Sequence, residues 1–350
     1  MPPDPWAPSP LARARRFLKV HGHRLWWLHS TYALSLGVGV VLFARRGFEH
    51  ARWLGASAAA AWLLAVVLFR VFGAGRKQDQ LDRAGTKARL PFYAMTYALK
   101  NLYQGMLFFL LPFAWQSTTL LSTNGWFVVV IAACAVLSTL DVVFDRVVFR
   151  YRAFAALLHA VALFGCVELA IPAFFPDARA STALLLAAGT MVVAFVSLQL
   201  RWDKTGARWA LGAVPGIGVA VTLAWVLRAA IPPMPAHLAH AAVGTGPDAQ
   251  GRLAVEATVV RASALGDLVC VTDVGTPPGD RIQHVWRRGG EVVLRAAEPA
   301  ARATVPGGAA RVRSALAGTK LPAEPAGRWS VDVETEDGQL VGRVGFAVEP

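Results

Sequence analysis

The stretch STALLLAAGTMVVAFVSLQL, residues 181–200, contains no charged residue and decides the fold of the first two-thirds of the chain. A bilayer-spanning helix needs about 20 mainly apolar residues, and this stretch meets that length. The whole chain agrees, because 55% of its residues are hydrophobic and only 16% are charged. Soluble domains average about 45–50% and about 25%, respectively. We therefore expect lipid to surround part of the chain.

Similar stretches on both sides predict about seven transmembrane helices between residues 25 and 231. The other six are Leu25–Ala44, Trp53–Phe72, Phe92–Trp115, Trp126–Phe144, Phe154–Phe175 and Trp209–Ile231. Tryptophans mark many of their ends, where aromatic side chains prefer the membrane interface. Residues 1–24 are proline-rich and then basic, and we interpret them as a cytoplasmic leader before a retained signal anchor.

Positive charge is divided unequally between the connecting segments, and this division predicts the orientation. The leader and the segments 70–90, 145–152 and 201–208 together hold 17 Lys and Arg residues, whereas the alternate segments hold 4. Cytoplasmic segments gather Lys and Arg, so the N-terminus is predicted to be cytoplasmic. After seven spans the C-terminal region lies outside the cytoplasm. We predict a multi-pass protein of the inner (cell) membrane.

The formal net charge of +13 does not indicate nucleic-acid binding. Residues 1–230 carry a net charge of +14 and residues 231–350 a net charge of −1. The excess therefore lies between apolar spans, whereas a nucleic-acid-binding domain has a basic face. The expected partners are the lipid bilayer and an envelope protein or polysaccharide, with no nucleic acid.

The pattern changes after the last span. The prolines of Pro232–Pro235 end the helix, and the Ala/Gly/Pro-rich segment 232–250 predicts a linker. The run Trp329–Val333 then alternates apolar and polar residues, and Asp337-Gly338 follows it, which is typical of a β-hairpin. Seven or so short strands in about 100 residues predict an immunoglobulin-like β-sandwich over residues 251–350.

Four motifs follow one another in this tail. They are C-x-T at Cys270–Thr272, I-x-H-x-W at Ile282–Trp286, G-x-W-x-V-x-V at Gly327–Val333 and F-x-V at Phe346–Val348. In this order they resemble the bacterial family called domain of unknown function 2914, over residues from about 255 to 349. An Arg-Thr-aromatic-Ser stretch of that family corresponds here to Arg311–Leu316, which lacks the aromatic residue. The membrane half resembles, by its architecture, domain of unknown function 5924. Neither resemblance implies an activity.

His284 and Trp286 form the candidate β-domain surface. They share one face of their predicted strand because side chains alternate along a strand. A Trp beside a His could form a shelf for a ligand such as a sugar ring. The alternative is a Trp buried in the core, with the His hydrogen-bonded beside it.

Polar residues within the predicted spans form a candidate intramembrane polar site. Charges inside a bilayer are costly and usually face the bundle interior or a water-filled cavity. Both a proton or substrate pathway and a structural ion pair fit this pattern. We expect Lys100 and Glu168 to face the interior, coupled directly or through water. The candidate residues are Lys100, Asn101, Gln104, Asp141, His159 and Glu168.

We find no catalytic or cofactor motif in the sequence. His237 and His240 are too few for a closed metal site, and Gly212–Gly216 has the GxxxG spacing that allows close helix approach. We therefore expect a non-enzymatic envelope protein without cofactor or metal, whose extracytoplasmic β-sandwich binds a partner or an envelope polymer. The alternative is a transporter or channel-like protein with Lys100 and Glu168 in its pathway, and an intramembrane enzyme is a third class.

Overall fold

The computed structural model describes most of the chain, apart from the N-terminal segment and several connections. The described residues are 31–32, 34–42, 51–70, 86–119, 122–140, 144, 151–199, 206–247, 253–276, 280–297, 303–304, 309–317 and 321–350. The predicted leader, residues 1–24, and Asp141 therefore lie outside the described residues.

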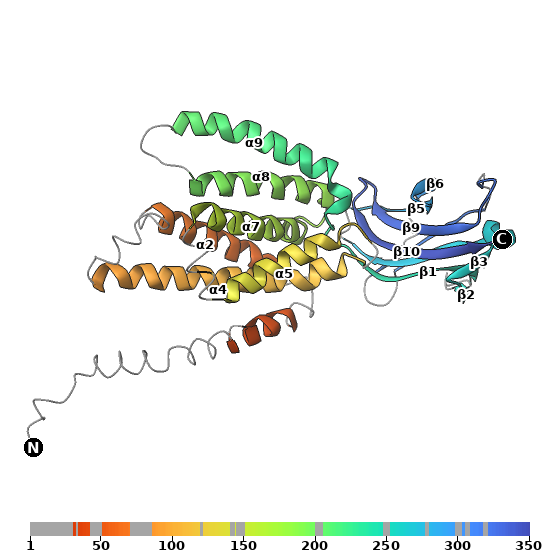
Figure 1. Ribbon diagram of the computed structural model, residues 1–350, viewed down its shortest axis with the longest axis horizontal. Coiled ribbons are helices and arrows are strands. Elements are labelled where there is room, and N and C mark those ends of the chain that lie inside the picture. The colour runs from red at the N-terminus through yellow and green to blue at the C-terminus, as the bar shows by residue number, and fades with distance from the viewer. Residues whose placement is uncertain are drawn as a thin grey trace, which may run out of the picture.

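Helices lying alongside one another form a bundle in the first two-thirds of the chain (Figure 1). They are α2 (Ala51–Arg70), α4 (Thr86–Gln116), α5 (Gly125–Thr139), α7 (Arg152–Phe174), α8 (Ala180–Gln199) and α9 (Gly206–Val226), followed by the short 3-10 helix η3 (Arg228–Ala230). An earlier helical segment, residues 34–42, approaches α4 where Gly37 faces the ring of Phe108.

Three of the predicted spans correspond to helices that are long and apolar enough to cross a membrane. They are Ala51–Phe69, Ala153–Phe174 and Ala180–Leu198. Gly125–Thr139 and Gly212–Val226 are apolar but shorter within the described residues. Of the two glycines in the predicted GxxxG spacing, only Gly216 lies close to the neighbouring helix. A methyl group added at Gly216 would lie 3.4 Å from Val192 of α8, whereas one added at Gly212 would meet nothing within 4 Å.

The C-terminal third is a β domain of two five-stranded sheets, which lies at one end of the bundle (Figure 1). The first sheet has the order β2-β1-β4-β8-β7 and the second β3-β10-β9-β5-β6. The elements are β1 (His237–Pro247), β2 (Leu253–Glu256), β3 (Val259–Arg261), the 3-10 helix η4 (Ala262–Asp267), β4 (Val269–Gly275), β5 (Ile282–Arg288), β6 (Glu291–Ala297), β7 (Ala303–Thr304), β8 (Ala310–Ala315), β9 (Gly327–Thr335) and β10 (Leu340–Glu349).

The predicted linker over residues 232–250 is wrong, because most of it is strand β1. This strand pairs with β2 on one side and with β4 on the other, so it lies inside its sheet. Gly244 permits the close approach to β2, since a methyl group there would lie 1.9 Å from the carbonyl oxygen of Val255. The small residues that resemble a linker in the sequence thus serve close strand packing.

The predicted hairpin around Asp337-Gly338 is present, formed by β9 and β10. Gly338 has a φ of +85°, a conformation that favours glycine. The apolar residues of β9, Trp329, Val331 and Val333, are buried as their alternation predicts. Trp329 joins one core cluster with Val243 of the first sheet, so the two sheets share a core.

The directions of α2, α4, α5, α7, α8 and α9 alternate, which brings one end of each toward the β domain. Helices α2, α5 and α8 begin there, and α4, α7 and α9 end there (Figure 1). For example, Arg52 near the start of α2 donates from Nε to the carbonyl oxygen of Ala173 near the end of α7, at 3.0 Å. The opposite ends of the helices lie away from the β domain.

Candidate functional site

The described part of the bundle has a buried polar pair at its centre, Tyr103 of α4 and His159 of α7. Tyr103 Oη and His159 Nδ1 lie 2.8 Å apart, and both side chains are almost completely buried. Their rings meet edge to face, with centroids 5.7 Å apart. Sequence reasoning selected His159 but missed Tyr103. The available signal was a tyrosine hydroxyl inside an apolar span, because such a group needs a partner when buried.

One face of α4 carries further polar residues into the interior. Thr96, Lys100 and Gln104 follow one another at four-residue spacing, and all three are buried. Lys100 is only 3% exposed. Asn101 does not belong to this face, because it is only partly buried and its side-chain amide donates to the carbonyl oxygen of Tyr97.

Glu168 lies nearer the β-domain end of α7 and is 1% exposed. Its carboxyl group is close to the backbone N–H of Met234. Nevertheless, neither carboxyl oxygen makes a hydrogen bond of good geometry to any described residue. A buried polar group without a partner is uncommon and needs an explanation.

Lys100 and Glu168 are both buried, which confirms that they face the interior, but they do not form one site. Helices α4 and α7 run in the same direction, because Tyr103 faces His159 and Leu110 faces Gly165. This register leaves about 12 residues between the levels of Lys100 and Glu168, or about 18 Å at the rise of an α-helix. The expected coupling, directly or through a bridging water, therefore does not fit these positions, because the third span is displaced along the fifth relative to the sequence-based alignment.

Residues of the bundle and of the β domain bind each other through buried backbone and side-chain groups. Ser117 Oγ donates to the carbonyl oxygen of Met234 at 3.0 Å, and the side-chain amide of Asn124 donates to the carbonyl oxygen of Leu340 at 2.8 Å. The backbone N–H of Arg343 donates to Thr119 Oγ1 at 3.2 Å. The α4–α5 connection is thus fixed to both Met234 and β10.

Carboxylates of the β domain bind the start of α8. Asp280 accepts from the backbone N–H of Ala180 with both oxygens, at 2.9 and 3.2 Å. Ser181 Oγ donates to Asp337 Oδ2 at 2.6 Å, and Arg179 lies 3.7 Å from Asp337 and 3.8 Å from Glu336. The first turn of a helix has unsatisfied N–H groups and a positive dipole end, so it favours carboxylates. Sequence reasoning missed these residues, because nothing local links position 280 or 337 to position 180.

His284 and Trp286 lie in the core of the β domain and form no surface. Both are 0% exposed. His284 Nε2 lies 2.8 Å from Thr272 Oγ1, and its Nδ1 lies 2.7 Å from Ser314 Oγ, which also accepts from Trp286 Nε1 at 2.9 Å. The network joins the two sheets, and burial lowers the pKa of His284 to about 4. The ligand-shelf interpretation is wrong and the core interpretation is confirmed.

The two histidines of the segment after the last span are separated in β1. The ring of His237 lies against Gly275, whereas His240 Nε2 lies 3.5 Å from Glu256 Oε1 at the surface. Among the residues that the structure describes, no three His, Cys, Asp or Glu side chains gather as a metal site.

Two family models match the chain. The model described as "Family of unknown function (DUF5924)" covers residues 10–267, well over half of the chain. The chain belongs to this DUF5924 family. The model described as "Protein of unknown function (DUF2914)" covers residues 279–348, which confirms the resemblance of the tail. No curated protein and no solved structure matches the chain.

The boundary between the two family matches falls inside the β domain. The DUF5924 match includes β1, β2 and β3, and the DUF2914 match includes β5 to β10. Both sheets combine strands from the two matched regions, since β1 and β8 lie in one sheet and β3 and β10 pair in the other. The two matched regions therefore form one structural unit in this chain.

Proposed function

We propose that this DUF5924 family member is a non-enzymatic envelope protein that holds its β domain at the outer surface of a membrane-spanning bundle. The observation that carries the proposal is the junction, where the outer end of the bundle binds the β domain through buried hydrogen bonds and carboxylates. In this proposal the β domain is an immunoglobulin-like sandwich, which two sheets with a shared core support.

Seven spans and an outward-facing β domain agree with the positions of the charges. The basic segments between residues 70 and 90, 145 and 152, and 201 and 208 connect helix ends that lie away from the β domain. Three arginines at the other end have structural contacts: Arg52 binds a helix-end carbonyl, and Arg179 and Arg228 bind the β9–β10 turn. Arg52 and Arg179 therefore do not weaken the positive-inside argument.

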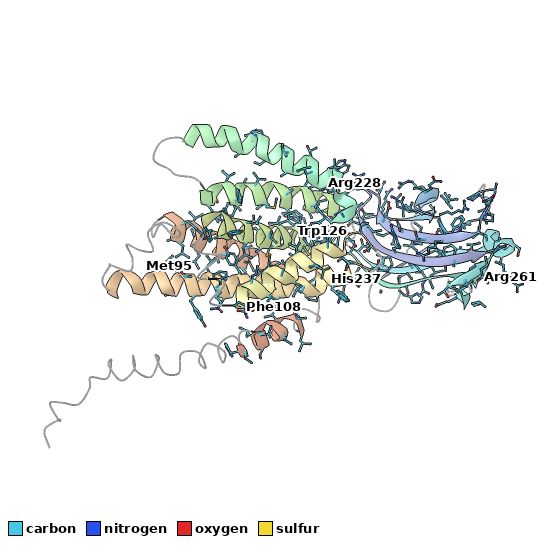
Figure 2. The ribbon with its side chains drawn as sticks, viewed as in Figure 1. Met95, Phe108, Trp126, Arg228, His237 and Arg261 are labelled. Carbon is cyan, nitrogen blue, oxygen red and sulfur yellow. The ribbon has the colours of Figure 1, made fainter. Side chains whose placement is uncertain are left out.

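Tryptophans support a membrane surface at the level of the junction. Trp53, Trp115, Trp126 and Trp225 lie at the β-domain ends of their helices and are between 41% and 73% exposed. Aromatic side chains gather at the membrane interface in this way. Figure 2 shows Trp126 and Arg228 close to the boundary between bundle and β domain.

The end of the β domain far from the bundle is the part that a partner reaches. Arg261 lies there (Figure 2), close to the short strands β2 and β3. Val255 and Val259 on these strands are 60% and 51% exposed. In the described sheets β2 and β3 are edge strands, and exposed apolar side chains on edge strands suit an envelope protein partner.

The transport alternative receives less support. A pathway residue should reach water from at least one side, yet Lys100 is 3% exposed. A sealed interior around Lys100 favours the anchor over the transporter.

Two experiments on the full chain in cells test the proposal. A phosphatase fused after Pro350 should be active and one fused between residues 71 and 85 silent; the reverse pattern would contradict the orientation.

A photo-crosslinking residue in place of Val255 or Val259 should give a discrete adduct with an envelope component, whereas one in place of the exposed bundle residue Leu63 should give lipid adducts only. The absence of any adduct at both valines would contradict the partner-binding role.

A further inference from the structure

Residues 231–236, here called the plug, close the β-domain end of the bundle. Ile231, Met234 and Ala236 are 8%, 1% and 0% exposed. Met234 belongs to the hydrophobic core of the bundle, not to that of the β domain. A methyl group added at Gly165 would lie 3.5 Å from Met234 Cε, so the Met side chain packs between helices.

The plug covers Glu168. The backbone N–H of Met234 is the polar group close to the Glu168 carboxyl, and the carbonyl of the same residue accepts from Ser117 Oγ at 3.0 Å. The carbonyl of Met234 is therefore fixed by Ser117, while its N–H lies close to a buried carboxyl that makes no hydrogen bond of good geometry to any described residue.

No flexible linker separates the plug from the β domain. Strand β1 begins at His237, directly after Ala236. Three of the six plug residues are prolines, which fix the backbone φ angle and remove conformational freedom. A movement of β1 away from the bundle must therefore move Met234 as well.

Polar and charged contacts hold the β domain in this position. We call Asp280, Glu336 and Asp337 the latch, because all three bind residues 179–181 at the start of α8. Arg228 Nε also donates to the carbonyl oxygen of Asp337, at 2.5 Å. Such contacts exchange readily with water, unlike a large apolar interface.

The closed junction also leaves polar groups without hydrogen bonds. Besides Glu168, the side-chain amide of Gln339 is completely buried and makes no hydrogen bond to any described residue. Gln339 lies in the β9–β10 turn, next to the latch. Opening would return such groups to water, which lowers the free-energy cost of separating the two parts.

We propose that the plug is a gate over Glu168, and that a partner pulling the β domain off α8 opens it. The closed gate excludes water, and the open gate lets water and protons reach the carboxyl from the side of the β domain. This inference uses the partner-binding role of the proposed function but not the membrane orientation. Binding at the β domain and access to the bundle interior are thus one coupled equilibrium.

Cysteine accessibility in the full chain tests the gate. Met234→Cys is introduced, and its reaction with a water-soluble maleimide is measured by peptide mass mapping in permeabilised membranes, where orientation has no influence. We expect slow labelling in the otherwise unchanged chain and labelling at least about tenfold faster after Asp280→Lys with Asp337→Lys, because charged hydrogen bonds are lost. The matched control is Asp267→Lys, an exposed acid in η4, which should leave the rate unchanged.

A second measurement covers the case in which Met234→Cys or the double latch variant perturbs the plug. Hydrogen exchange of the peptide around Glu168 is compared between the native chain and Asp280→Asn, which keeps the size of the side chain. Faster exchange in the variant supports the gate. Equal rates of maleimide labelling with and without the latch, or equal hydrogen exchange, overturn it. If these tests fail while crosslinks at Val255 persist, the partner-binding role stands without a gate.

Discussion

The core between the two sheets of the β domain and the interior of the helical bundle differ in how their buried polar groups are hydrogen-bonded. In the β domain, both ring nitrogens of His284 have hydroxyl partners, and Trp286 shares one of them. In the bundle, His159 has a partner at Nδ1 but none at Nε2 among the described residues, and the Glu168 carboxyl has none. Low dielectric makes a satisfied network rigid and an unsatisfied group costly.

This difference separates structural from functional candidates better than residue type does. His284 and Trp286 had the composition of a binding surface, yet their contacts are those of a core. The Glu168 carboxyl lacks such partners among the described residues, and it lies close to Met234, where the bundle meets the β domain. A buried polar group without its hydrogen bonds is therefore the better pointer to a place that changes state.

The sharpest test of the comparison concerns the independence of the β domain. The sequence predicts a β-sandwich over residues 251–350, but a fragment 248–350 lacks β1, with which β2 and β4 pair. We expect this fragment to lose cooperative unfolding, whereas a fragment 236–350 unfolds cooperatively with β-rich circular dichroism. Equal melting curves for the two fragments would show that β1 is dispensable.

The completeness of the β-domain network is tested by Ser314→Ala. This change removes the partner of His284 Nδ1 and of Trp286 Nε1. Each buried polar group that loses its hydrogen-bond partner costs about 1–3 kcal/mol, so the free energy of unfolding should fall by roughly 2–4 kcal/mol. Ser263→Ala, at an exposed position of η4, serves as the control and should change it little. A small loss for Ser314→Ala would mean that water replaces the hydroxyl.

The same network predicts a pH dependence. Burial lowers the pKa of His284 from 6.5 to about 4, and burial also lowers that of His237. The unfolded state therefore binds protons that the folded state excludes, and stability falls as the pH drops from about 6.5 to about 4, by up to about 3 kcal/mol for His284. Thermal melting should show this loss, and His284→Asn should reduce it.

Packing in the bundle is tested at Gly165. A methyl group there would lie 2.7 Å from Leu110 Cδ1, in the layer that also contains Met234. Gly165→Ala should therefore destabilise the full chain in detergent by about 1–3 kcal/mol through overpacking. Gly105→Ala is the matched control, because a methyl group at Gly105 of α4 meets nothing within 4 Å. Equal melting temperatures would contradict the close packing at Gly165.

The smallest expected effect is the coupling between Lys100 and Glu168. Their levels differ by about 18 Å along the bundle, and sites that far apart usually add to within about 0.5 kcal/mol. Lys100→Met and Glu168→Gln should therefore have additive effects on thermal stability in a double-mutant cycle. If the double mutant recovered part of the lost thermal stability, the two residues would be coupled after all, contrary to the structure.

Several features were predictable from local sequence. Uncharged runs such as 181–200 identify helices that can cross a membrane, because lipid forces the backbone to satisfy its own hydrogen bonds. Alternation from Trp329 to Val333 identifies a strand, although the polar positions Asp332 and Glu334 are buried as well, and Asp337-Gly338 identifies its turn. The motifs of the tail identify its family. Each of these signals depends on residues close together in the chain.

Other features required the tertiary structure. Strand β1 has the composition of a linker, and only the approach of β2 and β4 explains its small residues. Glu168 and Met234 meet across the junction, and Asp280 binds a helix that begins 100 residues earlier. The offset between Lys100 and Glu168 depends on how two helices slide past each other, which helical periodicity leaves open. Polarity and period are thus local properties, whereas register and junction contacts arise only when distant segments pack together.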